Sequence, residues 1–489
     1  MSTRCLLVVA LALSGCANYP AMPRPKPNFV FLLADDLGWK DLGCYGSTFY
    51  ETPNIDRLAR GGMRFTNAYA ACPVCSPTRA SIMAGKYPAR MHTTDYFGGR
   101  RKGRMLPASY IHQLPQKEVT IAEALKVAGY RTGFFGKWHL GAKPHTPQSQ
   151  GFDVNFAGFR GGMPPGGYFS PYKNPELTDG PKGEHLTERL TDEALKFIDR
   201  SKDQPFLLYF SYYNVHTPLQ TKPEYRAKYI AKREKLPEPT GPKWLPEGNR
   251  KCRQIQDHAV YAGMVQHLDE SVGRVLAKIE QLGLSDNTII IFMSDNGGLS
   301  TSEGHPTSNL PLRAGKGWLY EGGIREPMIV RWPGATKPNS TCDLPIISTD
   351  FYPTMLEMAG LPKSADQHMD GRSFASQLRG SRQSWPRSLF WHYPHYGNQG
   401  GTPGSAIRTG DFKLIEFHEP AAPWPSVGGE PRVELYNLAS DPGEKVDLSR
   451  EMPQKTQELR DDLHTWRHAV DATMPKPNPD WKPRGGRKR

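Results

Sequence analysis

The sequence lacks a hydrophobic run long enough to cross a membrane as a helix. Its apolar run near the N-terminus, Leu6 to Leu13, is too short for a stable span, and no second run reaches that length. Arg4 gives this segment a positive start, which is typical of a secretory signal peptide over residues 1–15. We therefore expect an exported protein that meets a membrane only through an attached lipid.

Cysteine is scarce as well. The 489 residues contain seven cysteines, and beyond the signal region there are five: Cys44, Cys72, Cys75, Cys252 and Cys342. Their wide spacing excludes a disulfide-rich scaffold, and it leaves the pairing open. An odd number in an oxidising compartment indicates that one of them is chemically special.

The end of the signal segment, Leu13-Ser14-Gly15-Cys16, is similar to the bacterial lipobox, whose cysteine is lipidated. The alternative is ordinary cleavage of the signal peptide, in which Cys16 has no special role. We favour lipidation of Cys16 because the pattern stands directly after the apolar run. Residues 16–27 are rich in proline and typical of a tether. The resemblance implies a cell-envelope lipoprotein of a bacterium, in the periplasm or at the outer membrane and cell surface.

Acidic residues are outnumbered by basic ones, 49 to 62, so that the formal net charge is +13. Such a balance favours polyanionic partners. No recognition helix or zinc-finger spacing is present, so we expect no nucleic acid and favour a sulfated polysaccharide. For the C-terminal residues 476–489, a solvated, disordered basic tail explains the composition equally well.

Long apolar strand patterns alternate with helical ones through most of the chain. Asn28 to Ala34 and Thr288 to Met293 are continuous apolar runs, typical of central parallel strands that are buried on both faces. These patterns predict an α/β catalytic domain over residues 28–375, with a large, mostly parallel or mixed sheet flanked by helices. Alternating half-buried strands and a closing helix then predict a smaller C-terminal antiparallel α+β subdomain over residues 385–475.

Oxygen-bearing side chains follow both apolar runs directly. Asp35 and Asp36 come after the first, and Asp295 and Asn296 come after the second. The carboxyl ends of parallel strands are where open sheets place their ligands. Adjacent carboxylates repel each other unless a cation lies between them, and oxygen donors without thiolate or imidazole favour Ca²⁺ ahead of Mg²⁺. A helix cap at Asp35 and Asp36 is the alternative for that pair alone.

A short segment, Cys75-Ser76-Pro77-Thr78-Arg79, precedes a stretch that we expect to be helical from Arg79 and to end at Gly85. Cys75 then stands just before a helix N-terminus, where backbone N–H groups favour an anion. The alternative is a buried or disulfide-bonded cysteine beside a chance proline.

Further cationic and proton-carrying groups follow expected strands. Lys137 and His139 come after a strand that ends near Phe135, and both point to one side if the chain there is extended. His216 follows the expected strand Phe206 to Ser211, and Lys316 stands between two glycines. For each group taken alone, the alternative is an ordinary polar side chain on the protein surface.

Together these motifs resemble the formylglycine-dependent (type I) sulfatases, the arylsulfatase family of the alkaline phosphatase superfamily, and in particular bacterial polysaccharide sulfatases. The resemblance covers roughly Asn28 to Leu448. It implies an alkaline-phosphatase-like fold and the conversion of Cys75 to 3-oxoalanine (formylglycine) by a formylglycine-generating enzyme. It also implies one Ca²⁺ held by a set of five residues, Asp35, Asp36, Asp295, Asn296 and the modified residue 75.

The resemblance also implies the reaction. A hydroxyl of the aldehyde hydrate at residue 75 attacks sulfur, and the second hydroxyl, deprotonated by His139, then expels sulfate and restores the aldehyde. Arg79, Lys137 and Lys316 neutralise the sulfate. His216, with Lys316, is the candidate for protonating the leaving alcohol.

Two other classes of function are alternatives. The first is a phosphate or phosphonate ester hydrolase of the same superfamily, and the second is a non-catalytic binder of sulfated glycans. For the substrate we lean to sulfated galactan or chondroitin fragments, because the stretch after Asn309 loosely resembles enzymes acting on galactose-type sugars. Three loops have compositions that suit contact with sugar: Tyr96 to Met105, Gly158 to Lys173 and His392 to Gly404. The sequence predicts no oligomeric state.

Overall fold

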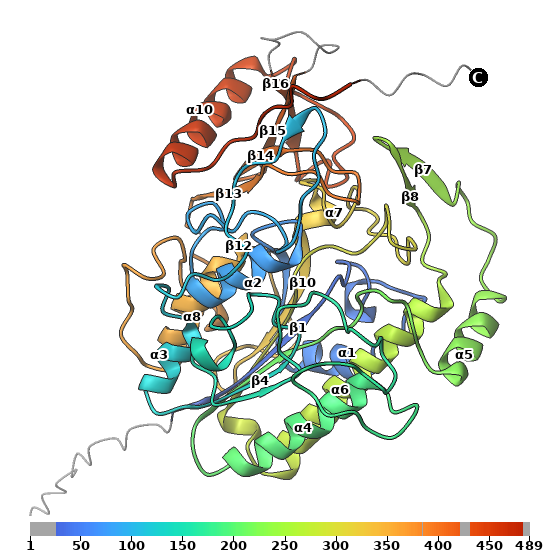
Figure 1. Cartoon of the computed structure of the whole chain (residues 1–489), viewed down its shortest axis with the longest axis vertical. Helices are drawn as coiled ribbons and strands as arrows, with labels where there is room; N and C mark the ends of the chain where they lie inside the picture. Colours follow the sequence, from blue (N-terminus) through green and yellow to red (C-terminus); the bar gives the residue numbers. More distant parts are fainter. Residues whose placement is uncertain (1–25, 384, 421–430, 483–489) are drawn as a thin grey trace, which may run out of the picture.

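The computed structural model describes residues 26–383, 385–420 and 431–482. A nine-stranded sheet forms the centre of the α/β fold (Figure 1), in the order β11-β2-β10-β9-β1-β6-β4-β5, with β12 paired to β2. Its strands are β1 (Asn28–Ala34), β2 (Met63–Tyr69), β4 (Arg131–Gly136), β5 (Val154–Phe156), β6 (Phe206–Ser211), β9 (Thr288–Ser294), β10 (Arg325–Arg331), β11 (Ser340–Cys342) and β12 (Ile346–Ile347). The predicted fold class is confirmed.

The central strand β1 lies between β9 and β6 and is parallel to both, whereas β10 runs antiparallel to β9 and β2. Alternate residues of β1 enter two different cores. Val30, Leu32 and Ala34 face one core, and Phe29, Phe31 and Leu33 face the other. A strand covered on both faces has to be apolar at every position, and this explains its uninterrupted hydrophobic sequence.

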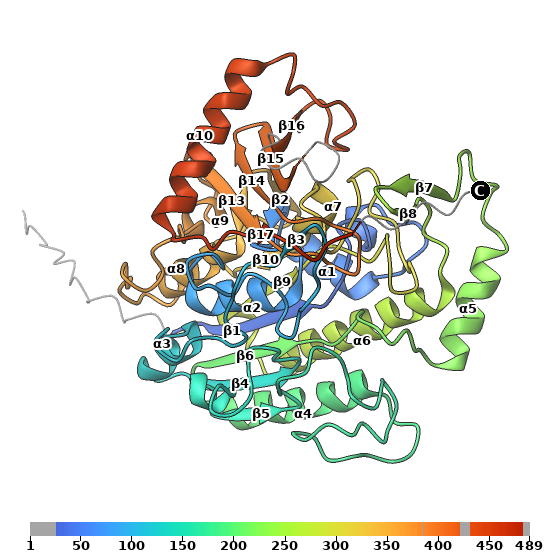
Figure 2. The same ribbon diagram turned by 45° about the horizontal axis from the view of Figure 1, so that its top comes forward.

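Helices cover both faces of the sheet, as Figure 2 shows. On one face lie α1 (Pro53–Gly61), α4 (Leu186–Ser201) and α6 (Ala259–Gln281), and on the other lie α2 (Cys75–Ala84), α3 (Ile121–Val127), α8 (Phe351–Met358) and α9 (Ala375–Leu378). The helix α3 begins with the predicted capping box between Thr120 and Glu123. No helix among the described residues has the length and apolar character of a membrane span.

A four-stranded antiparallel sheet with one long helix forms the C-terminal part of the chain, at one end of the molecule (Figure 1). It consists of β13 (Ser388–Tyr393), β14 (Gly404–Thr409), β15 (Phe412–Pro420), β16 (Pro431–Asn437) and α10 (Pro453–Ala469). A third core joins this sheet to the catalytic part through Trp391, Trp318 and Tyr69. The division into two domains at residues 375–385 stays a prediction.

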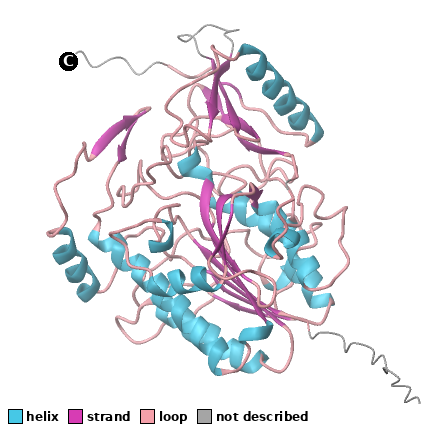
Figure 3. Cartoon of the chain, turned by 180° about the vertical axis from the view of Figure 1, so that it is seen from behind, coloured by secondary structure: helices cyan, strands magenta, loops and turns pink. Residues whose placement is uncertain are grey.

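The segment that follows β6 carries α5 (Pro223–Arg233) and a hairpin of β7 (Trp244–Glu247) and β8 (Arg250–Arg253). Figure 3 shows it standing out from the main body. The short helix α7 (Glu321–Ile324) precedes β10, and single 3₁₀ turns lie at Gly43–Tyr45, Gln148–Gln150, Ser285–Asn287 and Ser348–Asp350.

Two local expectations were wrong. The helix α2 begins at Cys75 rather than at Arg79, because Pro77 falls in its first turn, where a missing N–H costs no intrahelical bond. We also expected disorder from residue 476, but β17 (Lys476–Pro477) pairs with β3 (Met105–Leu106). The signal peptide, the lipobox at Cys16 and most of the tether lie outside the described residues.

Candidate active site

The ends of three parallel strands, β1, β4 and β9, bring predicted oxygen ligands and a cation together. Asp35 follows β1, Lys137 follows β4, and Asp295 follows β9. Lys137 Nζ lies 2.6 Å from Asp35 Oδ2, and the backbone N–H of Asp36 donates to Asp295 Oδ1 at 3.2 Å. Because neighbouring parallel strands end at the same edge of the sheet, these groups meet there.

Cations balance the carboxylates of this cluster. Lys316 Nζ lies 2.7 Å from Asp36 Oδ1, and Arg79 Nη2 lies 2.7 Å from Asp295 Oδ2. The lysine and arginine side chains are at most 5% exposed, and the carboxylates are fully buried. Burial lowers the pKa of Lys316, but the surrounding negative charges, with Asp36 first, together outweigh burial and raise that pKa well above its ordinary value, so the ammonium group stays charged.

Two buried oxygens in the cluster have no hydrogen-bond donor. Neither Asp35 Oδ1 nor Asn296 Oδ1 accepts a hydrogen bond, although Arg79 Nη2 lies 3.7 Å from Asp35 Oδ1, while Asn296 Nδ2 donates to Asp36 Oδ1 at 2.8 Å. Burial raises the pKa of Asp35 in spite of Lys137, because the neighbouring carboxylates of Asp295 and Asp36 act in the same direction. Unpartnered oxygens among repelling carboxylates fit a hard cation.

Asp35, Asp36 and His216 also form a group whose potential ligand atoms lie within 4.8 Å of one another. This group shares two residues with the predicted ligand set and adds an imidazole that we had not counted as a ligand. His216 Nε2 lies 3.7 Å from Asp36 Oδ2. Its Nδ1 bonds the carbonyl oxygen of Thr217 at 2.8 Å, so Nδ1 carries the proton and Nε2 faces the carboxylate. Burial and Lys316 lower the pKa of His216 to about 3.

Cys75 is the first residue of α2 and is 3% exposed. Its Sγ lies 3.3 Å from His139 Nδ1. Burial raises the pKa of the Cys75 thiol although Lys137 and Lys316 act against the rise. An unmodified thiol at this position is therefore neutral and a weak nucleophile.

His139 is held in one tautomer. Its Nε2 lies 3.4 Å from the carbonyl oxygen of Phe97, which can only accept, so Nε2 carries the proton and Nδ1 offers its lone pair to residue 75. Burial and the charge of Lys137 hold the pKa of His139 well below its usual range. Lys137 and His139 would point to one side on an extended backbone, but His139 has a left-handed φ of 54°, so that condition is not met.

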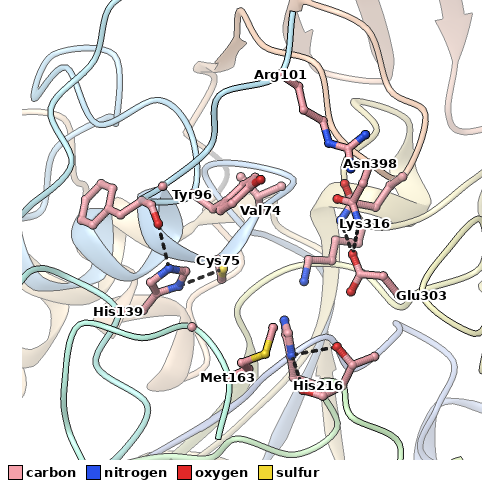
Figure 4. A pocket seen from close by; sticks show the side chains of 15 residues that line it. Val74, Cys75, Tyr96, Arg101, His139, Met163, His216, Glu303, Lys316 and Asn398 are labelled. Atoms are coloured by element: carbon pink, nitrogen blue, oxygen red, sulfur yellow. Dashed lines mark hydrogen bonds between the residues drawn. The ribbon is translucent and has the colours of Figure 1, made fainter. Parts of the chain in front are cut away.

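A pocket of about 550 Å³ opens above this cluster. Of the predicted residues, Cys75, His139, His216 and Lys316 line it (Figure 4). The others lie below, and we call them the floor: Asp35, Asp36, Arg79, Lys137, Asp295 and Asn296. Arg79 and Lys137 therefore act on the pocket through the carboxylates that they hold.

Further residues line the mouth, and we call them the rim: Tyr96, Arg101, Met163, Glu303, Asn398 and Gln399. Five of them come from the three loops predicted to suit sugar contact. Glu303 was missed, because Ser302-Glu303-Gly304 has no motif. The close approach of Gly401 to Gly317 brings the loop with Asn398 to Lys316, since a Cβ on Gly401 would lie 1.8 Å from the Gly317 carbonyl oxygen.

Two family models match the chain. The sulfatase model covers residues 27–361, and the model described as N-sulphoglucosamine sulphohydrolase, C-terminal, covers residues 314–469. A sulfatase of Formosa agariphila is 35% identical over 514 residues, which cover 89% of this chain and 86% of that protein. The chain belongs to the sulfatase family. This sulfatase is thus a hydrolase of sulfate esters, of class EC 3.1.6.

The chain is also similar to two proteins whose name or structure title mentions a saccharide. The N-acetylgalactosamine-6-sulfatase of Mus musculus is 31% identical, with 91% of this sulfatase and 85% of that protein covered. Ps i-CgsB, in a crystal structure with k-i-k-neocarrahexaose, is 29% identical with a TM-score of 0.72, covering 93% of this sulfatase and 94% of that chain.

Proposed function

We propose that this sulfatase removes sulfate from a sulfated glycan, with the modified side chain of residue 75 as nucleophile and one Ca²⁺ in the floor. The observation that carries the proposal is the position of Cys75. It stands at a helix N-terminus above the carboxylate cluster, with Sγ 3.3 Å from a neutral imidazole nitrogen. Backbone N–H groups at that helix end and the buried cations suit a bound anion.

Asp35, Asp36, Asp295, Asn296 and residue 75 would hold the Ca²⁺, and the unpartnered oxygens of Asp35 and Asn296 support this set. A calcium ion there would neutralise sulfate oxygens as a Lewis acid. Formylglycine at residue 75 would supply, as its hydrate, a hydroxyl nucleophile that a neutral thiol lacks.

The chain's own residues handle the protons. His139 Nδ1 is a free acceptor beside residue 75, so we assign it the general-base role there. Lys316 and His216 lie on the other side of the pocket (Figure 4), next to Asp36. Lys316 is charged, and we assign the proton for the leaving alcohol to the pair of Lys316 and His216.

For the substrate we propose a galactose-type sulfated saccharide, such as a sulfated galactan or chondroitin fragment. Two relatives support a saccharide, one named for N-acetylgalactosamine 6-sulfate and one bound to k-i-k-neocarrahexaose. The exposed cation Arg101 and the half-buried amide of Asn398 at the rim suit a polar, anionic sugar.

The test combines mass spectrometry with activity assays. We expect the peptide containing residue 75 to have the mass of formylglycine, and the purified protein to hydrolyse 4-nitrophenyl sulfate and saccharide sulfates. Cys75→Ala should abolish turnover, whereas Cys72→Ala, at a buried cysteine nearby, is the matched control. Full activity with an unaltered thiol at residue 75, or faster hydrolysis of a phosphonate monoester than of sulfates, would contradict the proposal.

A further inference from the structure

A negative charge stands in the wall of a pocket that otherwise suits anions. The carboxylate of Glu303 lines the pocket beside Lys316 and Asn398 (Figure 4). Glu303 acts on Lys316 as the next strongest charge after Asp36. It forms no salt bridge within 4 Å with any described residue and is half-buried.

The carboxylate is held in a fixed position. Asn398 Nδ2 and Gln399 Nε2 both donate to Glu303 Oε1, the second at 2.8 Å. The backbone of Gln399 is itself fixed, since its backbone carbonyl oxygen accepts a hydrogen bond from Trp318 Nε1 at 3.0 Å. Glu303 also has a left-handed φ of 52°, which a residue with a side chain seldom adopts unless its surroundings impose it.

This arrangement leaves the second oxygen for the substrate. Both amides bind Oε1, and Oε2 accepts no hydrogen bond from the described residues. A carboxylate at this place repels any second anionic group of the substrate, and it can only accept hydrogen bonds. A hydroxyl group on the carbon next to the sulfate ester satisfies both conditions, and a second sulfate there satisfies neither.

We propose that Glu303 is a specificity-determining residue that accepts a hydrogen bond from a free hydroxyl adjacent to the scissile sulfate, and so excludes sugars sulfated at that hydroxyl. The inference rests on the proposed function of the pocket and adds a rule about the substrate. Sites built to pair with a hydroxyl reject analogues that cannot donate, because their own polar groups are then left unpaired.

The consequence is an order of events. Because a neighbouring sulfate is rejected, this sulfatase acts on a densely sulfated glycan only after another sulfatase has removed that group. Specificity of this kind comes from the repulsion of a competing substrate as well as from attraction of the preferred one.

The experiment uses the full-length, modified enzyme and measures kcat/KM for three kinds of probe. These are 4-nitrophenyl sulfate, the best of a panel of monosulfated galactose, N-acetylgalactosamine, N-acetylglucosamine and fucose, and that sugar with a second sulfate at the adjacent hydroxyl. We expect the wild type to prefer the monosulfated sugar over the disulfated one by about 100-fold or more.

The variant Glu303→Gln keeps the shape of the side chain and removes its charge. We expect the mono- to disulfated preference to fall below about 10-fold, and the monosulfated sugar to lose at least about 10-fold more kcat/KM than the aryl sulfate does. Glu234→Gln is the control. It removes an exposed carboxylate at the C-terminal end of α5, which does not line the pocket, and it should leave both ratios as in the wild type.

Three results would overturn the inference. One is an equal loss of kcat/KM with aryl and sugar sulfates in Glu303→Gln. That result would mean that Glu303 acts only through its effect on the charge of Lys316. Another is a wild type that accepts the disulfated sugar as well as the monosulfated one. The third is aryl sulfate turnover without turnover of any monosulfated sugar. An enzyme inactive with every sulfated probe would instead overturn the proposed function, and this inference with it.

Discussion

The floor and the rim of the pocket are built in different ways. Every floor residue is at most 2% exposed, and its charges are paired within the cluster at distances such as 2.6 Å for Lys137 and Asp35. The rim comes from four loops and is mostly half-buried or exposed, with Met163 52% exposed. The floor follows strand ends, whereas the rim depends on loops that meet only in the folded chain.

This difference separates chemistry from selectivity. Changing a charged floor residue leaves a buried partner charge uncompensated, so substitutions there strongly lower the free energy of unfolding. Most rim residues are open to the pocket or to solvent on one side, so substitutions there should leave the fold intact. The catalytic groups lie between the floor and the rim. The floor holds them in position and the rim selects the substrate that reaches them; these groups are Cys75, His139, His216 and Lys316. The predictions below test this separation, and they run from the largest expected effect to the smallest.

After Cys75→Ala, His139→Ala should cause the largest loss, about 10⁴-fold in steady-state turnover, because it removes the base beside residue 75 while the floor stays intact. We expect a burst of one alcohol per active site from 4-nitrophenyl sulfate, followed by arrest, and a peptide containing residue 75 that has gained the mass of sulfate. His112→Ala changes a rather exposed histidine and is the control. Steady turnover without a burst would move this role away from His139.

Asp295→Ala should cost about 10³-fold in activity and also about 3–5 kcal/mol in the free energy of unfolding. The stability falls because the guanidinium of Arg79, 2.7 Å from Asp295, loses its partner in a buried site. Thermal unfolding with added Ca²⁺ and with a chelator tests the metal as well. The wild type should gain melting temperature from Ca²⁺, and the variant should gain less.

Asp295→Asn keeps an oxygen ligand and is the matched variant, with an intermediate loss expected. Elemental analysis that finds two zinc ions per chain, or full activity without metal, would contradict the calcium assignment. Full activity without metal would also show that the floor is a structural ion-pair cluster only.

Sequence patterns revealed most of the floor. The apolar runs before Asp35 and Asp295 predicted parallel strands, and strands of one sheet end at one edge, so proximity followed without a structure. The predicted capping box at Thr120 likewise depends on neighbours in sequence. The pattern missed the start of α2, because Pro77 in a first helical turn looks like a helix breaker.

The rim was predicted only as loops of suitable composition. Asn398 reaches Glu303 across 95 residues, and that contact depends on how the C-terminal sheet packs on the catalytic part. The left-handed backbones of His139 and Glu303 were not predicted either, because neither residue is glycine. Local patterns predict what neighbours in sequence do, and the rim is made of tertiary contacts.

His216→Ala should have an effect that depends on the leaving group. We expect about 10²-fold loss with sugar sulfates and a much smaller loss with 4-nitrophenyl sulfate, whose phenolate needs little protonation. Kinetic comparison of the two substrate types measures this, and Lys316→Ala run beside it shows which group supplies the proton. An equal loss with both substrates in His216→Ala would assign His216 to sulfate binding and leave Lys316 as the acid.

Glu416→Gln should have the smallest effect on activity, because Glu416 lies far from the floor. A small effect is still expected, since Glu416 supports the sheet that carries two rim residues. The Glu416 side chain is 3% exposed and lies 2.8 Å from Arg467 Nη1 and 2.7 Å from Arg460 Nε. Burial raises its pKa, but these cations outweigh burial and lower it to about 2, from an ordinary value of 4.5. Loss of the charge should destabilise the fold by about 2 kcal/mol at pH 7.

The pH dependence gives the sign of this last prediction. A carboxyl whose pKa is depressed in the folded state contributes its stability above pH 4.5, and that contribution is lost as the pH falls toward 2. The difference in free energy of unfolding between wild type and Glu416→Gln should therefore be present from pH 5 upward and shrink below pH 4.5. At 25 °C the variant should keep aryl sulfate turnover within about threefold and lose somewhat more with sugars. If instead it lost aryl turnover as strongly as a floor variant does, the C-terminal sheet would have to be part of the catalytic chemistry, and the separation of floor from rim would fail.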